Sequence, residues 1–233
     1  MQTHHVMEEP KRIVQQGYDQ LGSHYRMHYE ETNPERYIHW LPEVTQRLPS
    51  TANILELGCA DGIPTARFLS QHFGYLGIDI SPVQIELARA NVPNARFEVA
   101  DMTTLTFPDA VFDAVIALYS IIHVPLAEQP TLINAVYQWL RPEGYFMCIM
   151  GANEWTGTET NWIASDTRMY WSHTDADTYQ SWFIETGFTI IDRHFVTEGE
   201  AEHTFFWVQK QITTSPLPDK VVRSNRKNDL SAD

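Results

Sequence analysis

Cysteine is scarce in this chain of 233 residues, since only Cys59 and Cys148 are present. The two lie far apart and neither belongs to a C-x-x-C pair, which argues against a disulfide framework and a cysteine-based zinc site. His24 and His28 are spaced for neighbouring positions on a helix, but no third ligand accompanies them, so we expect no metal ion. Isolated thiols fit a reducing compartment, and the sequence therefore predicts a cytoplasmic protein.

Positive charge and long apolar runs are also in short supply. The formal net charge is −14, which repels phosphate backbones, and the basic cluster near the C-terminus is diluted by aspartates. No stretch reaches the roughly 18 uninterrupted apolar residues of a membrane span, and the N-terminus lacks the pattern of a signal peptide. We therefore expect neither a nucleic-acid partner nor a membrane partner.

Hydrophobic residues make up 43% of the chain, which is enough for one substantial core. Residues 1–50 are polar and aromatic, with helical spacing around Tyr18 and Tyr25, and they predict a helical N-terminal cover. The main domain is expected at residues 51–212. Residues 213–233 are expected to form a disordered tail.

Strand and helix patterns alternate within the main domain. Short apolar runs predict strands at 53–57, 75–79, 95–100, 111–118 and 145–150. Helical patterns at 65–72, 82–90 and 127–140 lie between them, with a turn at 141–144 before the fifth strand. This alternation is typical of parallel βαβ units with right-handed crossovers, and it predicts an α/β fold.

The pattern changes after Gly151. An insert at 151–172 is rich in Trp, Thr, Asn and Tyr and lacks steady periodicity, so it predicts a functional loop or lid. A helix at 175–186 follows, and then two strands at 188–196 and 203–210. These two strands predict an antiparallel hairpin that closes the sheet.

The residues that follow each strand point to an adenosine ligand. Small residues in the turn 55–62 let the backbone approach a ligand at a helix N-terminus. Asp79 ends the second strand, where its carboxylate can accept from both hydroxyls of a ribose. Asp101 and Met102 end the third strand, where they can accept from the adenine amine and cover the ring. NAD is the rival ligand, but its G-x-G-x-x-G fingerprint would need glycines at Ala60 and at the position of Ile63.

Five motifs together resemble the class I S-adenosylmethionine-dependent methyltransferase family over about residues 15–210. They are Leu55–Gly62, Gly77–Ser81, Val99–Met102, Phe112–Val115 and Leu140–Tyr145. The resemblance implies a Rossmann-like α/β fold with a seven-stranded mixed sheet of order 3-2-1-4-5-7-6. Strand 7 is antiparallel in that sheet, and helices cover both faces.

The resemblance also implies S-adenosyl-L-methionine as the cofactor. By position, Glu56, Gly58 and Ala60 would face its methionine part, although the family usually has glycine where Ala60 stands. Asp79 and Ile80 would face the ribose, and Asp101 with Met102 the adenine. The expected cofactor-binding set is completed by Tyr25, Gln84 and Tyr119.

Methyl transfer is an in-line displacement that needs a general base only when the acceptor must lose a proton. His123 is our first candidate for that base, because it follows the fourth strand at the boundary between cofactor and acceptor. The alternative for His123 is a structural role, capping a helix or satisfying a backbone carbonyl. His173 and Tyr170 are further catalytic candidates.

Aromatic residues of the insert and the N-terminal cover are candidates for an acceptor pocket. The expected substrate-binding residues are Tyr18, Trp155, Trp162, Trp171 and His203, with ordinary core packing as the alternative for the aromatic ones. We expect transfer to oxygen or nitrogen of a small molecule. C-methylation of a quinone or isoprenoid-like acceptor, and cofactor binding without catalysis, stay open at this point, as does the oligomeric state.

Overall fold

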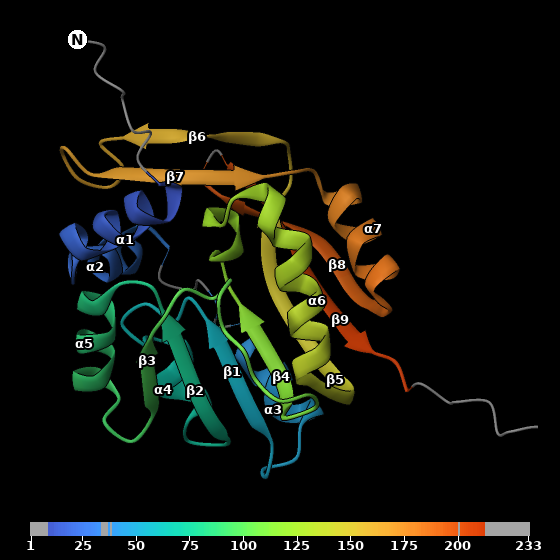
Figure 1. The fold of residues 1–233 in the computed structure, drawn as a ribbon. Coiled ribbons are helices and arrows are strands. Elements are labelled where there is room, and N and C mark those ends of the chain that lie inside the picture. Colours follow the sequence, from blue (N-terminus) through green and yellow to red (C-terminus); the bar gives the residue numbers. More distant parts are fainter. Residues whose placement is uncertain (1–8, 34–36, 38, 200, 213–233) are drawn as a thin grey trace, which may run out of the picture.

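The computed structural model describes residues 9–33, 37, 39–199 and 201–212, so the expected disordered tail lies outside the described residues. Its centre is a seven-stranded mixed sheet of order β3-β2-β1-β4-β5-β9-β8 (Figure 1). The strands are β1 (Asn53–Leu57), β2 (Gly74–Asp79), β3 (Arg96–Val99), β4 (Phe112–Ala117), β5 (Leu140–Gly151), β8 (Phe188–Glu198) and β9 (Ala201–Lys210). β9 runs antiparallel to both of its neighbours, while β1 to β5 are parallel. The predicted order and the antiparallel last strand are confirmed.

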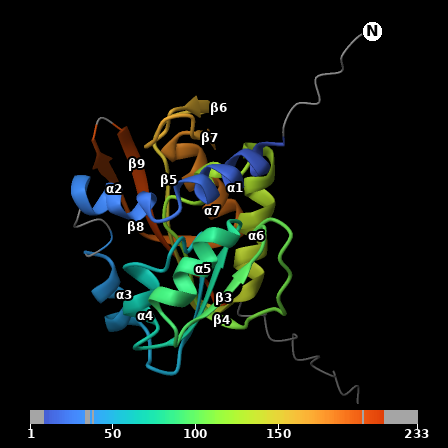
Figure 2. The same cartoon turned by 90° about the vertical axis from the view of Figure 1, so that its left-hand side faces the viewer.

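Helices cover both faces of this sheet because successive side chains of a strand point to opposite sides. Ile54 packs into the core beneath α3 (Leu41–Arg47), α4 (Thr65–Leu69) and α5 (Pro82–Asn91), whereas Leu55 faces the opposite layer. That layer contains α6 (Gln129–Trp139) and α7 (Ala176–Thr186). Figure 2 shows the two layers on either side of the sheet. None of the described helices has both the length and the apolar character of a membrane span.

The insert at 151–172, for which the sequence predicts a functional loop or lid, contains an ordered β-hairpin. β6 (Trp155–Thr160) pairs antiparallel with β7 (Arg168–His173) in a separate two-stranded sheet. The side chains of β6 are mostly exposed on both faces, so its sequence lacks the alternation of apolar and polar residues that predicts a strand. The irregular part is the connection 161–167. The hairpin lies across the top of the molecule, above the carboxyl ends of the central strands (Figure 1).

The fifth strand begins earlier than the sequence predicts. Residues 141–144 were expected to be a turn, but they belong to β5, where Glu143 has a φ of +66°. The pairing of β4 with β5 shifts register in this region, between Phe112 and Ala114. The Arg-Pro-Glu-Gly sequence therefore lies in an irregular first part of β5, because a β-bulge can accommodate turn-forming residues within a strand.

The N-terminal cover consists of α1 (Pro10–Leu21) and α2 (His24–Thr32), followed by α3. Gly22, with a φ of +50°, ends α1 and separates the two helices. α1 lies between the hairpin strand β7 above and α5 below (Figure 1). Gly17 permits this close approach, since a Cβ there would overlap the carbonyl oxygen of Arg168. α1 is thus a packed roof over the carboxyl edge of the sheet.

Candidate functional site

A pocket of about 860 Å³, counting its opening to solvent, lies at the carboxyl ends of the central strands beneath α1. This is the edge where ligands bind in open α/β sheets. The residues that line it come from the strand ends and from the N-terminal cover. They are Lys11, Val14, Tyr18, Tyr25, Tyr37, Glu56, Gly58, Cys59, Ala60, Ile63, Thr65, Ile78, Asp79, Ile80, Ala100, Asp101, Met102, Leu118, Tyr119, Ser120, His123 and Val124.

The turn after β1 brings the backbone to the pocket surface. Gly58 has a φ of +79°, and a Cβ there would overlap the Cβ of Ser120. Ala60 adopts a φ of +44°, a conformation that costs a residue with a side chain about 1–2 kcal/mol. The Asp79 carboxylate stabilises this turn, because Oδ2 accepts from the N–H of Ala60 at 2.9 Å and Oδ1 accepts from that of Ser81 at 2.9 Å. Asp79 therefore shapes the turn in addition to facing the pocket.

Two buried acids lie side by side at the centre of the site. Burial raises the pKa of Glu56 to about 8, the charge of Asp79 adds to this shift, and the hydroxyl of Tyr75, which donates to Glu56, opposes it. Burial likewise raises the pKa of Asp79 to about 6, against the effect of its backbone N–H partners. At neutral pH the centre therefore holds Glu56 largely as the neutral acid.

The adenine end predicted from the sequence is built around Asp101. Its Oδ1 accepts from the N–H of Thr103 at 2.9 Å and from the Thr103 hydroxyl at 2.8 Å, while Oδ2 lies 3.0 Å from Nζ of Lys11. Burial by itself would raise the pKa of Asp101, but the bonds from Thr103 and Lys11 bring it below its usual value. This carboxylate is thus charged over the working pH range. Lys11 was missed from the sequence, because nothing local connects it to a residue 90 positions away.

His123 also lines the pocket and belongs to the short 3₁₀ helix η1 (Ile121–His123). Its Nδ1 is 2.8 Å from the carbonyl oxygen of Tyr170, and its Nε2 is 3.1 Å from the hydroxyl of Tyr18. A carbonyl oxygen can only accept, so Nδ1 carries a proton, and in the neutral ring the Nε2 lone pair accepts from the Tyr18 hydroxyl. The ring satisfies a backbone carbonyl, as one alternative predicted, and at the same time presents a basic nitrogen to the pocket.

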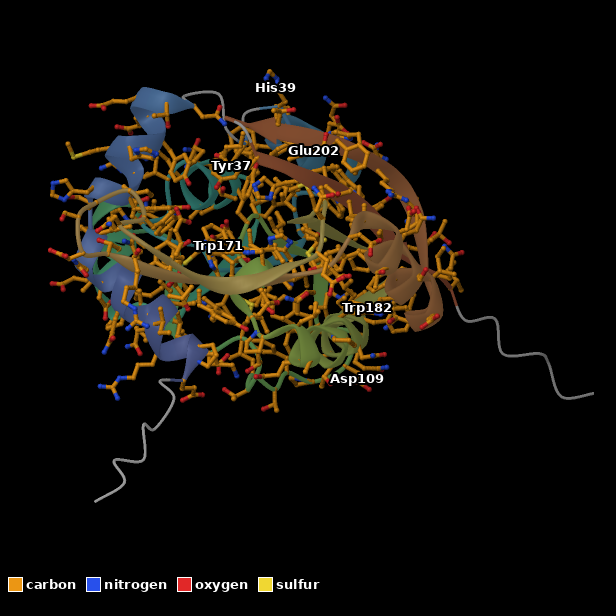
Figure 3. All side chains as sticks on the ribbon, turned by 90° about the horizontal axis from the view of Figure 1, so that it is seen from above. Tyr37, His39, Asp109, Trp171, Trp182 and Glu202 are labelled. Atoms are coloured by element: carbon orange, nitrogen blue, oxygen red, sulfur yellow. The ribbon has the colours of Figure 1, made fainter. Side chains whose placement is uncertain are left out.

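An aromatic cluster surrounds His123. The Trp162 ring packs edge-on against Tyr18 at 5.6 Å and against Trp171 at 5.6 Å between ring centroids, and Trp171 lies 4.4 Å from the His123 ring. Trp162 is buried and also lies 6.0 Å from Tyr25. Figure 3, viewed from above, shows Trp171 of β7 near the middle of the molecule. These tryptophans pack around His123, behind the residues that line the pocket.

Four other predicted site residues, Gln84, His173, Trp155 and Tyr170, are not among those that line the pocket. Gln84 is buried and its amide donates to the carbonyl oxygens of Tyr18 and Gly22, which ties α5 to the N-terminal cover. His173 faces Asn153, whose carbonyl oxygen is 2.5 Å from Nδ1, and burial lowers the pKa of its ring. Trp155 is 45% exposed on the hairpin. The Tyr170 link to His123 is through its backbone, and its side chain packs in the cluster around α1.

His203 reaches the site indirectly, through Tyr119. The two rings meet edge-on with centroids 4.9 Å apart, and Nε2 of His203 is 3.9 Å from the Glu198 carboxylate. Tyr119 lines the pocket at the end of β4 with a φ of +56°. Tyr37, Thr65 and Ser120 also line the pocket and were not selected from the sequence. Within the described ranges, no group of three side chains is arranged to hold a metal ion.

Comparison with known proteins relates this chain to methyltransferases. Residues 54–144 match the protein family described as "Methyltransferase domain". The chain is similar to phosphoethanolamine N-methyltransferase 1 from Zea mays, with 28% identity over 68% of this chain and 32% of the relative. It is also similar to an uncharacterized methyltransferase from Synechocystis sp., with 23% identity over 72% of this chain and 81% of the relative. The chain thus spans about a third of the length of the maize relative.

Solved structures with the same fold include magnesium protoporphyrin IX methyltransferase from Synechocystis PCC 6803 with bound S-adenosylmethionine. Its TM-score is 0.68 at 15% identity, over 88% of this chain and 99% of that one. At this level of identity the similarity establishes the fold alone.

Proposed function

We propose that this chain is a class I S-adenosylmethionine-dependent methyltransferase that transfers a methyl group from that cofactor to oxygen or nitrogen of a small molecule. One observation carries the proposal. A single pocket is lined both by Glu56, Asp79 and Asp101, from three strand ends, and by a Tyr18–His123 pair. The first three suit the parts of the cofactor, and the pair suits an acceptor that must lose a proton.

The residues present fit the cofactor. The absence of a Cβ at Gly58 lets Ser120 pack against this turn, and both residues line the pocket. Asp101 is a charged acceptor for an amine of the adenine, with Met102 beside it, while Asp79 and Ile80 suit the ribose. Glu56 suits the ammonium of the methionine part. When bound, the cofactor supplies a methyl group on a positively charged sulfur, which an electron pair of the acceptor attacks.

Proton removal falls to His123 in this proposal. The cofactor would give up the methyl group and keep the carbon–sulfur bonding pair on its sulfur, while the proton lost by the acceptor would pass to Nε2 of His123, directly or through the Tyr18 hydroxyl. Nδ1–H stays bonded to the Tyr170 carbonyl and fixes the ring orientation. A positioned general base typically contributes about 10²–10⁴-fold in rate.

The acceptor that suits the part of the pocket around His123 is small and aromatic or otherwise apolar. Its walls are the rings of Tyr18, Tyr25, Tyr37 and Tyr119, with Trp162 and Trp171 behind them. Aromatic rings offer apolar contact, and their hydroxyls can orient a polar group. We further propose the cytoplasm as the working compartment, which the two buried free cysteines suit.

The test combines binding with turnover. Isothermal titration of the wild type should show S-adenosylmethionine and S-adenosylhomocysteine binding, and a screen of phenols and amines with a methyl-labelled donor should find an acceptor. His123→Asn should keep the affinity for S-adenosylhomocysteine and lose at least about 10²-fold in kcat. The matched control is His173→Asn, because that histidine faces Asn153 instead of the pocket. Absence of binding to either compound by folded wild-type protein would overturn the proposal.

A further inference from the structure

Lys11 joins the roof helix α1 to the adenine end of the pocket. Its Nζ lies 3.0 Å from Oδ2 of Asp101 and 2.6 Å from Oε2 of Glu128, and it donates to the Thr103 hydroxyl at 2.6 Å. Asp101 and Thr103 follow β3, whereas Glu128 belongs to η2 (Leu126–Glu128), before α6. One ammonium group therefore connects three segments that are distant in the sequence.

This ion pair is shielded enough to orient its partners. The side chains of Lys11 and Asp101 are 16% and 25% exposed, so solvent and salt screen their attraction only in part. Thr103 occupies Oδ1 of Asp101, and Lys11 holds Oδ2 at the pocket wall. Because the bonds are charge-assisted, they fix the carboxylate more firmly than neutral bonds would.

Other ties hold the same helix to the neighbouring strand end. Asp19 of α1 accepts from the Ser81 hydroxyl at 2.6 Å, two residues after Asp79, and Gln84 donates to the carbonyl oxygens of Tyr18 and Gly22. Of these described ties, the one through Lys11 reaches a carboxylate that we assign to the cofactor. The same helix carries Tyr18, so its closed position also brings the Tyr18 hydroxyl to His123.

We infer that Lys11 is a positioning residue that couples cofactor binding to closure of α1, by holding Asp101 and the helix together only when both are in place. The inference rests on the proposed function, since it takes the Asp101 end as the adenine subsite. Coupling of this kind is reciprocal: the closed helix retains the cofactor, and the bound cofactor stabilises the closed helix. Separation of α1 from the sheet removes the cation from Asp101 and opens the adenine end.

The variant Lys11→Met keeps the length of the side chain and removes the charge. We expect it to weaken S-adenosylhomocysteine binding by about tenfold, a typical coupling between two sites, mainly through faster dissociation. Amide hydrogen exchange should show that S-adenosylhomocysteine slows exchange in α1 of the wild type and has much less effect in the variant. With an acceptor in hand, KM for S-adenosylmethionine should rise while kcat at saturation stays near the wild-type value.

Lys210→Met is the matched control, because Lys210 is also a part-buried lysine but donates to the carbonyl oxygens of Tyr137 and Leu140. It should leave affinity and exchange in α1 unchanged. A Lys11→Met variant that is folded, binds within twofold of the wild type and keeps the exchange response of α1 would overturn the inference. Absence of cofactor binding by the wild type would instead overturn the proposed function.

Discussion

The hydroxyl of Tyr18 lies 3.1 Å from Nε2 of His123, although 105 positions separate the two residues in the sequence. The roof helix α1 supplies the first, and the segment after β4 supplies the second. The carbonyl oxygen of Tyr170, in the hairpin strand β7, holds the opposite side of the imidazole. Three elements that cover the sheet thus meet at His123. This arrangement predicts the effect of substitutions at Tyr18 and Tyr170.

Tyr18→Phe should lower kcat by about tenfold or more and leave the affinity for S-adenosylhomocysteine nearly unchanged, because only the hydroxyl next to the base is lost. Steady-state kinetics and titration measure the two effects. Tyr170→Phe is the matched control, since the backbone of Tyr170 contacts His123 and its hydroxyl does not. A greater loss of kcat in Tyr170→Phe than in Tyr18→Phe would contradict this assignment.

The stability of the cofactor-free protein should fall as pH rises from about 4.5 to about 8. Burial raises the pKa of Glu56 from 4.5 to about 8, so folding favours its neutral form. That contribution is fully present below the unfolded pKa and is lost as pH rises through the folded pKa. Its full size is on the order of a few kcal/mol. Melting temperatures of the wild type and Glu56→Gln across this range should show a steeper decline in the wild type.

The control for that comparison is Glu86→Gln, because Glu86 is an exposed carboxylate on α5. Its melting curve should follow the wild type at every pH. Identical pH dependence in Glu56→Gln and the wild type would show that Glu56 is not the group that titrates.

Binding of S-adenosylmethionine at pH 7 should release up to about one proton. The neutral Glu56 of the free protein must ionise if it is to pair with the ammonium of the methionine part. Titrations in buffers with different ionisation enthalpies measure the number of protons released. Glu56→Gln should release none, and a wild type that releases none would argue against this placement of the ammonium.

Two substitutions in the turn after β1 should have opposite outcomes. Gly58→Ala should abolish S-adenosylhomocysteine binding and destabilise the fold, because the new Cβ overlaps Ser120 at a φ of +79°. Ala60→Gly should be tolerated, since it relieves a residue at a φ of +44° and restores the glycine expected from the family resemblance. Thermal unfolding and titration report both, and equal behaviour of the two variants would contradict the role of the turn.

Asp79 is a less informative position for substitution than the sequence suggests. Its carboxylate accepts from the N–H groups of Ala60 and Ser81, so Asp79→Ala removes the support of the turn together with any contact to a ribose. Asp101→Asn leaves that turn intact and tests the adenine end by itself. Its effect on cofactor affinity, compared with that of Lys11→Met, separates the two partners of the ion pair.

The sheet and the residues at its strand ends could be predicted from local sequence patterns. Apolar runs, Gly58 and the acids after β2 and β3 lie within short segments, and in a parallel sheet such segments must deliver their ends to one edge. The hairpin at β6 and β7 escaped this reasoning, because its exposed first strand lacks an apolar period.

The distant residues that meet those strand ends could not be predicted in this way, because they are brought there by tertiary packing. The pairing of Lys11 with Asp101 and of Tyr18 with His123 depends on how α1 packs between the hairpin and α5. That packing depends on the burial of apolar side chains at Ile13, Val14 and Leu21, and on the close approach at Gly17. The hydrophobic effect is non-directional, so local sequence patterns do not specify which partner an apolar side chain packs against. The strand ends can therefore be predicted from the sequence, but the packing of α1 above them cannot.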